Sequence, residues 1–370
     1  MRNAIVSFSS DGIVTDIIEA ADVDSQAGVE FYNGVLIPDL VNAHCHIELS
    51  YLKGTIPPGG GFIEFARQLG QVRGIYTEEE RIAAASFQDA VLWRQGVVAV
   101  GDISNGATSF VVKSGSNIRY DSFLELYGLQ CVDADSLMPL ADMASTCKIS
   151  YTVTPHSTYS LNKNAFSSAV AGFPGQERDL PLSIHFMESE AEKELYDGKG
   201  PMKAWYNERK MNTDFTGYGS PADRIVAQVP KDRNIMLIHN CFVTASDIDI
   251  IHNHFNGRVT WVLCPGSNDY ISGIKPPVSL LRSKGATIAI GTDSLASNYS
   301  LDMVSEMRMI DGVPLTELVE WATINGSRAL GDQNEALGFE RGSRSGAVLI
   351  SGLNWHNMSL TPESRSERIL

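Results

Sequence analysis

The segment "LVNAHCHIELS" (residues 40–50) sets two histidines one residue apart at the end of an apolar run. In an extended strand, residues i and i+2 point to the same side, so His44 and His46 can both reach one ion. The H-x-H pattern is short, however, and by itself it fits equally well two ordinary polar residues that close a strand. The rest of the chain has to decide between these two interpretations.

A repeated pattern surrounds this segment: a short aliphatic or β-branched run, a polar or glycine-containing loop, then a longer amphipathic stretch. Such alternation is typical of βα units around a parallel sheet. We predict eight strands, at residues 34–44, 96–104, 123–129, 150–156, 181–186, 234–240, 259–265 and 287–293. Eight strands separated by helices favour an α/β fold of the closed (β/α)8 TIM-like barrel type over a doubly wound sheet.

The two ends of the chain have a different pattern, with short strands separated by turns. We therefore predict a small β-sandwich domain formed by both termini, residues 1–38 and 338–370. Residues 39–337 would form the barrel. The length of 370 residues suits a barrel of about 250 residues with such an addition.

Composition excludes several classes of protein. A formal net charge of -15 argues against a nucleic-acid partner. The five cysteines include no C-x-x-C pair, which argues against a disulfide framework or a cysteine-rich zinc site. We find no signal peptide and no segment apolar enough to cross a membrane, so we expect a soluble, cytoplasmic protein without a membrane partner. The sequence leaves open whether the chain forms a homo-oligomer.

Other polar residues also end predicted strands. They are His156, His185, His239 and Asp293, on the fourth, fifth, sixth and eighth strands. The carboxyl ends of barrel strands meet at one mouth, so these residues are expected to lie near His44 and His46. Glu188 follows His185 by three residues and is expected at the same mouth. Each placement alone is a weak signal, whereas their joint occurrence indicates a site.

A second H-x-H pair tests this reasoning. His252 and His254 lie in "TASDIDIIHNHFNG" (residues 244–257), which has a helical pattern. In a helix, residues i and i+2 do not share a face. We therefore assign this pair to a solvated helix end and not to a metal site.

Seven stretches carry a family resemblance: "VNAHCHIELSYLKG", "VTPHSTYS", "IHFMESEAE", "LIHN", "CPGSN", "IGTDSLASN" and "ATINGSRALG". In this order, and across nearly the whole chain, they resemble the amidohydrolase superfamily, particularly its deaminase and chlorohydrolase branch. The resemblance implies a (β/α)8 barrel that carries a small β-sandwich made from both termini. The strand pattern leads independently to the same fold.

The resemblance also implies roles for individual residues. By position, the metal ligands would be His44, His46, His185 and Asp293. Glu188 matches the acid/base, His239 matches the histidine that contacts the activated water, and Asp293 would help to orient that water. Members with two metal ions use a carboxylated lysine on the fourth strand, and "SYTVTPH" (residues 150–156) has no lysine. We therefore expect one divalent ion, with zinc as the default choice and iron as the alternative.

A small-molecule substrate is implied as well, an aminated heterocycle or nucleoside that loses ammonia from a cyclic amidine carbon. "HIELSYLKG" and "GGGFIEFARQL" resemble aminodeoxyfutalosine deaminases, and guanine, pterin and methylthioadenosine/adenosylhomocysteine deaminases share parts of the pattern. Glu48 and His156 are the expected substrate contacts, although Glu48 could instead orient a ligand histidine. Asp269 stands where an apolar residue is usual in the family, and we expect it to touch the pocket.

Two other functions remain open. A chlorohydrolase-type hydrolase would displace a different group by the same attack on a ring carbon. A non-catalytic binding protein on the same barrel would be expected to lack a ligand or Glu188, and none is missing. The segment from Leu52 to Leu69, with its Pro-Pro-Gly-Gly-Gly run, is expected to form a loop that covers a bulky nucleoside tail.

Overall fold

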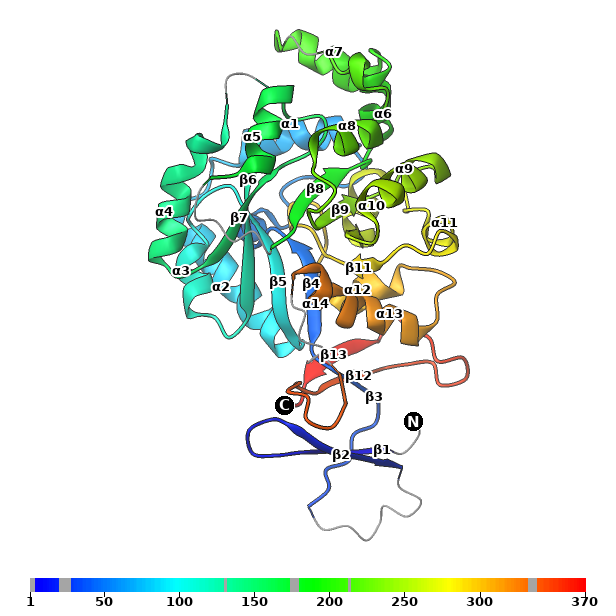
Figure 1. Cartoon of the computed structure of the whole chain (residues 1–370). Coiled ribbons are helices and arrows are strands. Elements are labelled where there is room, and N and C mark those ends of the chain that lie inside the picture. Colours follow the sequence, from blue (N-terminus) through cyan, green and yellow to red (C-terminus); the bar gives the residue numbers. More distant parts are fainter. Residues whose placement is uncertain (1–3, 20–27, 130–131, 174–179, 212–213, 332–337) are drawn as a thin grey trace.

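Figure 1 shows a computed structural model of the chain, which describes residues 4–19, 28–129, 132–173, 180–211, 214–331 and 338–370. Eight parallel strands form its centre in two runs of four. The first run has the order β4 (Leu40–Cys45), β5 (Val97–Ser104), β6 (Arg119–Leu126) and β7 (Ser150–Pro155). The second has the order β8 (Leu182–Phe186), β9 (Ile235–His239), β10 (Val259–Leu263) and β11 (Ile288–Ile290).

Backbone hydrogen bonds join the two runs at both junctions. At one junction, the amide of His185 donates to the carbonyl of His156 over 2.9 Å. At the other, the amides of Thr292 and Asp293 donate to the carbonyl of His44 over 2.9 and 3.0 Å. The sheet is therefore closed, and each predicted strand overlaps one of the eight. The predicted (β/α)8 fold is confirmed.

The interior of the barrel is an apolar core. Residues two apart on a strand point to the same side, and Val41 and Ala43 on β4 are both fully buried. They belong to one cluster with Met236 and Ile238 of β9, and Leu330 packs against the same cluster. Because these side chains fill the barrel, it is a packed core and not a pore.

Helices cover the outside of the barrel (Figure 1). Helix α2 (Glu78–Arg94) begins at a capping box, in which the side chains of Thr77 and Glu80 each accept from the other residue's backbone amide. The other α-helices are α1 (Phe62–Val72), α3 (Phe110–Gly115), α4 (Met138–Thr146), α5 (Lys163–Ala171), α6 (Glu190–Tyr196), α7 (Gly200–Glu208), α8 (Pro221–Gln228), α9 (Ala245–Phe255), α10 (Pro265–Ser272), α11 (Val278–Ser283), α12 (Met303–Arg308), α13 (Leu315–Ala322) and α14 (Ile324–Ala329). Short 3-10 helices are η1 (Ile47–Leu52), η2 (Ala134–Leu137) and η3 (Thr216–Tyr218). Within the described ranges, none of the helices has the length and apolar character to cross a membrane.

Both ends of the chain contribute short strands outside the barrel (Figure 1). These are β1 (Ala4–Phe8), β2 (Val14–Glu19), β3 (Val35–Ile37), β12 (Val348–Ser351) and β13 (Arg365–Arg368). The first two form an antiparallel ribbon, and β12 lies between β3 and β13 in a three-stranded sheet. A single β-sandwich domain with the bounds 1–38 and 338–370 stays a prediction, and residues 1–3 and 20–27 of it lie outside the described residues.

Two predicted segments differ from the structure. The predicted strand 34–44 is divided into β3 and β4, which belong to different sheets. Pro38 lies between them, and proline cannot donate a hydrogen bond to a continuing strand. The expected loop from Leu52 to Leu69 ends at Gly61, because α1 begins at the next residue. The amide of Gly61 donates to the carbonyl of Ile271 over 2.9 Å, so this loop is fastened to α10.

Candidate metal centre and active site

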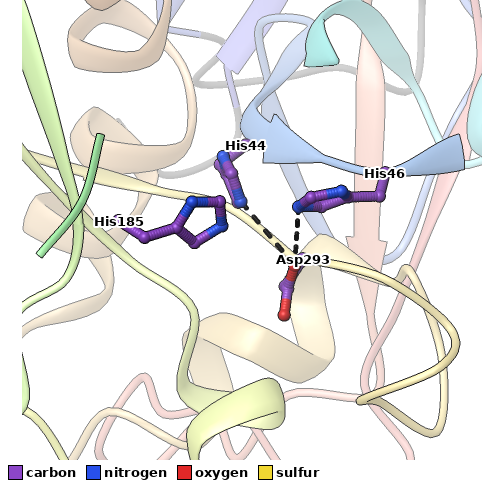
Figure 2. A group of neighbouring side chains, drawn as sticks. All are labelled: His44, His46, His185 and Asp293. Atoms are coloured by element: carbon purple, nitrogen blue, oxygen red, sulfur yellow. Dashed lines mark ion pairs between the residues drawn. The ribbon is translucent and has the colours of Figure 1, made fainter. Parts of the chain in front are cut away.

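Three histidines and one aspartate meet at the carboxyl ends of the barrel strands. His44 lies in β4 and His46 directly after it, His185 lies in β8, and Asp293 follows β11. One ligand atom from each lies within 4.8 Å of the others, and all four residues are buried. Figure 2 shows the three imidazoles around the Asp293 carboxylate, whose Oδ1 lies 3.6 Å from Nε2 of His44 and 3.2 Å from Nε2 of His46. The sequence-based expectation that these side chains meet is correct.

The backbone at these strand ends is unusual. Asp293 has a φ of 56°, His239 has 76°, and Met187, just before Glu188, has 50°. Residues other than glycine rarely adopt this left-handed region, which costs of order 1–3 kcal/mol per residue. The chain therefore turns sharply at the ends of β8, β9 and β11, where it presents these side chains.

The chemistry of the four residues fits a divalent metal ion. Burial lowers the pKa of His44 to about 4 and that of His46 to about 3, so both rings are neutral near pH 7, as metal ligands must be. Among the residues that the structure describes, neither ring nitrogen of His44 has a hydrogen-bond partner, although both nitrogens are buried. The Oδ2 of Asp293 accepts from the hydroxyls of Ser267 (2.5 Å) and Ser297 (2.7 Å), which leaves Oδ1 facing the imidazoles. Three imidazoles and one carboxylate are a common donor set for zinc, which binds each histidine in its neutral form.

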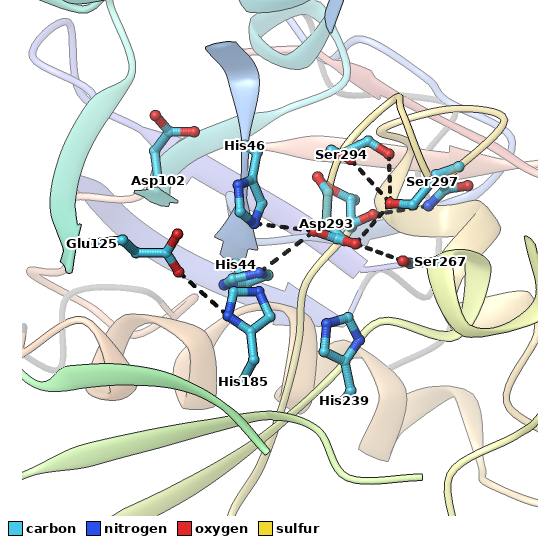
Figure 3. A network of polar contacts seen from close by, with 12 residues as sticks. His44, His46, Asp102, Glu125, His185, His239, Ser267, Asp293, Ser294 and Ser297 are labelled. Carbon is cyan, nitrogen blue, oxygen red and sulfur yellow. Dashed lines mark hydrogen bonds and ion pairs between the residues drawn. The ribbon is translucent and has the colours of Figure 1, made fainter. Parts of the chain in front are cut away.

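Glu125, on β6, contacts the cluster through His185. Its Oε1 lies 3.3 Å from Nδ1 of His185 (Figure 3). The carbonyl of His156 lies 3.0 Å from the same nitrogen. Burial opposes a charge on His185, but the Glu125 carboxylate outweighs it and raises the pKa of His185 to about 9. A carboxylate on the second ring nitrogen is the usual device that orients a ligand histidine. Glu125 was not expected from the sequence, although a glutamate within the apolar run "FLEL" (residues 123–126) was a signal for it.

Glu125, His156 and His185 also lie close enough to hold an ion between them. His185 can offer one ring nitrogen in each direction, however, and its Nδ1 already faces Glu125 and the His156 carbonyl. We therefore interpret these three residues as support for the four-residue cluster and not as a second metal site.

Glu188 and His239 lie beside the cluster, as expected. Oε1 of Glu188 is 3.7 Å from Nε2 of His239, and Oε2 accepts from the hydroxyl of Tyr159 over 3.5 Å. Nδ1 of His239 lies 2.9 Å from Oδ1 of Asn268, and its ring stacks on that of His185 at 5.3 Å between centroids. Burial raises the pKa of Glu188 to about 7 and lowers the pKa of His239 to about 4. A carboxyl group poised near neutrality can both take and give a proton.

The two expected substrate contacts occupy different positions at the mouth. Glu48 is buried in η1, where its carboxylate accepts from the Asn105 amide (3.2 Å) and from Nη2 of Arg73 (3.2 Å). The hydrogen bonds and ion pairs resolved for Glu48 in the described residues include no histidine, so nothing here favours its alternative role of orienting one. His156 stacks on His185 at 4.6 Å between ring centroids. The contact of either residue with substrate stays a prediction, and Arg73 was not foreseen from the sequence.

A buried ion pair holds the turn that follows His46. Oδ1 of Asp102 accepts from the amide of Ile47 over 2.8 Å, and its other oxygen pairs with Lys113. Both side chains are fully buried. Removing one member of such a pair leaves an uncompensated charge in the interior, so the pair fixes where η1 begins.

The other residues singled out from the sequence, His252, His254 and Asp269, are not members of the cluster. His252 and His254 are in the last turn of α9, as predicted, and both are partly buried there. Nε2 of His252 accepts from the Trp261 indole (3.1 Å), and Nε2 of His254 lies 2.9 Å from the Val229 carbonyl. Asp269 is solvent-exposed on α10, and its expected contact with the pocket stays a prediction.

Comparison with known proteins gives a family and several relatives. The model of the amidohydrolase family matches residues 134–337. A Helicobacter pylori protein named adenosine deaminase is 27% identical over 311 residues, which cover 80% of this chain and 74% of the relative. A 5-methylthioadenosine/S-adenosylhomocysteine deaminase of Halobacterium salinarum is 26% identical over 87% of this chain and 76% of its own. An aminodeoxyfutalosine deaminase of Nitratiruptor sp. is 26% identical over 84% and 76%.

Solved structures share the fold across nearly the whole chain. The structure of H. pylori aminofutalosine deaminase in complex with methylthio-coformycin superposes with a TM-score of 0.79 at 23% identity, covering 99% of this chain and 94% of its own. An adenosine deaminase of Xanthomonas campestris with bound zinc has a TM-score of 0.72 at 21% identity, covering 95% and 80%.

Glu125→Gln tests the support of His185. We expect this substitution to weaken zinc binding by about 10- to 100-fold, because the amide lacks the negative charge that orients the imidazole. Competition with a chelator of known zinc affinity measures the effect. Glu320→Gln, which changes an exposed carboxylate on α13, serves as the control. Equal zinc affinities for wild type and Glu125→Gln would contradict the assignment.

Proposed function

The chain belongs to the amidohydrolase family, and from this premise we propose that it is a metal-dependent hydrolytic deaminase that releases ammonia from an aminated purine-type nucleoside or base. One observation carries the proposal: the four-residue cluster lies at the same barrel mouth as Glu188 and His239. The relatives named above, which are nucleoside deaminases, support the same reaction class.

In this proposal one divalent ion is held by His44, His46, His185 and Asp293. Zinc is the default, since the donor set suits it and a related structure carries zinc; iron would use the same residues. When bound, such an ion supplies Lewis-acid activation of water near neutral pH. Strand β7 has no lysine that could bridge a second ion, which favours a single one.

Glu188 moves the protons in this reaction. Its buried carboxyl can take a proton from water and give it to the ring nitrogen next to the amino-bearing carbon, which makes that carbon electrophilic. The carboxylate would then take a second proton from the hydroxyl group added to the carbon and give it to the amino group, so that the C–N bond breaks and ammonia leaves. His239 has its Nδ1 held by Asn268, so its Nε2, which faces the Glu188 carboxylate, can orient the attacking water. Asp293 would also help to orient this water.

The substrate must present an N–C–NH2 unit of the amidine type, as aminated purines and pterins do. Glu48, Arg73 and His156 provide polar groups around the mouth, which suits a nucleoside better than a small chlorinated ring. Aminodeoxyfutalosine is the first compound to test. Guanine, pterins and methylthioadenosine/adenosylhomocysteine are the alternatives within the deaminases.

Two other assignments receive less support. A chlorohydrolase-type reaction would use the same cluster on a different leaving group. A non-catalytic binding protein would not need Glu188 and all four members of the cluster, which are present here. A cytoplasmic location stays a prediction from the sequence, which leaves the oligomeric state open.

Glu188→Gln tests the acid/base. We expect this substitution to lower kcat by about a hundredfold or more, because glutamine cannot take up the proton, while the metal content stays that of wild type. Ammonia release and metal analysis on the same samples provide the measurement. Glu190→Gln changes an exposed neighbour on α6 and should keep full activity. Near-normal turnover of metal-loaded Glu188→Gln protein would show that the role is misassigned.

A substrate panel tests the reaction itself. We expect the highest kcat/KM for a nucleoside when aminodeoxyfutalosine, methylthioadenosine, adenosine, guanine and isoxanthopterin are compared by ammonia release from metal-loaded protein. A clear preference for guanine or isoxanthopterin would overturn the nucleoside assignment. Ammonia release from none of the five would contradict the deaminase and favour the chlorohydrolase type of reaction.

A further inference from the structure

A buried carboxyl group outside the metal cluster links two parts of the site. Glu192, on α6, has no exposed surface. One of its oxygens accepts from the hydroxyl of Thr158, and the other accepts from the backbone amide of Glu188 over 3.3 Å. Burial raises the pKa of Glu192 to about 8. A buried carboxyl is costly unless its hydrogen bonds are satisfied, so these two bonds account for its presence there.

The Thr158 end of this link is firmly fixed. The carbonyl of Thr158 accepts from Nη1 of Arg224 (2.5 Å) and from the Tyr196 hydroxyl (2.9 Å). Arg224 also donates to the carbonyl of Leu161 over 2.8 Å and is itself fully buried. Its guanidinium lies over the rings of Phe166, Phe215 and Tyr218, at 4.8, 5.1 and 5.0 Å. The segment between β7 and α5, which contains His156 and Tyr159, is therefore anchored at Thr158.

The Glu188 end of the link lies at a sharp turn. Met187 has its positive φ here, and its carbonyl accepts from the Phe242 amide over 3.0 Å. The turn directs the amide of Glu188 into the interior, where an amide without an acceptor is costly. Glu192 is that acceptor. The side chain of Glu188 returns to the same anchored segment through the Tyr159 hydroxyl.

We propose that Glu192 is a positioning residue for Glu188, which it ties to the segment that carries His156 and Tyr159. The acid/base Glu188 and the expected substrate contact His156 are then held in a fixed position relative to each other. This inference rests on the proposed function and deepens it, because it explains how the proton donor is kept in register with the ring nitrogen. A displacement of about 1 Å at such a position can cost about a hundredfold in rate.

The two hydrogen bonds of Glu192 predict which substitution at this position is tolerated. Glutamine keeps an acceptor for the Glu188 amide, and the Thr158 hydroxyl can rotate to accept from its NH2 group. Alanine has neither group. Thr158→Val removes the hydroxyl without a large change of shape and so breaks the link from the other side.

The first measurement is steady-state deamination with intact, metal-loaded protein. For Glu192→Ala we expect kcat to fall about 10- to 100-fold with KM changed less than about threefold, and for Glu192→Gln we expect kcat within about threefold of wild type. Thr158→Val should resemble Glu192→Ala, and the double variant should lose little more, because both remove one link. Glu190→Ala, from the exposed face of α6, is the matched control.

The second measurement is hydrogen exchange by mass spectrometry, which does not need turnover. Peptides that cover residues 186–190 and 156–160 should exchange faster together in Glu192→Ala, while the rest of the barrel stays protected. The proposal would be overturned if both peptides of Glu192→Ala exchanged at the wild-type rate. A wild-type kcat per bound metal ion in Glu192→Ala would overturn it as well. If Glu192→Ala fails to fold, Thr158→Val decides by the same criteria. Absence of deamination by wild type would refute the proposed function alone, and the exchange comparison would still test the link.

Discussion

The closure of the barrel at the carbonyl of His44 is the contact on which the rest of the site depends. This oxygen accepts from the amides of Thr292 and Asp293, so the hydrogen bonds that join β4 to β11 also place Asp293 against the histidines. Gly291 allows this approach, since a Cβ on it would lie 2.8 Å from Cβ of His44. The left-handed backbone of Asp293 then turns its carboxylate toward the rings. The fold and the candidate metal centre are therefore specified by one junction.

Because the charged side chains of the site are buried, each of them needs a hydrogen-bond or ion-pair partner. A charge in the interior is costly unless it is paired or hydrogen-bonded, and every carboxylate near the mouth has such partners. Two hydroxyls hold Asp293, His185 faces Glu125, and Lys113 pairs with Asp102. Side chains held in this way keep their geometry before any ligand arrives, which is what electrostatic catalysis requires.

The sequence predicts the barrel and the cluster for a definite reason: strand periodicity locates the strand ends, and parallel strands bring their ends together. His44, His185 and Asp293 could be placed in this way without knowledge of their partners. Glu125 and Arg73 could not, because their importance depends on which residues of other strands they face. The start of β6 could not be predicted either, because charged residues interrupt its apolar pattern. The strand begins at Arg119 and not at Phe123. The bounds of the terminal domain stay predictions for a related reason, since short strands leave only a weak pattern.

The central claim is that His44, His46, His185 and Asp293 together hold a single divalent ion. Elemental analysis of metal-supplemented protein tests it most directly, with His185→Asn measured in parallel. We predict about one transition-metal ion per wild-type chain and a large loss in the variant, as four protein ligands around one ion require. Two ions per chain, none after supplementation, or an undiminished content in His185→Asn would contradict the claim.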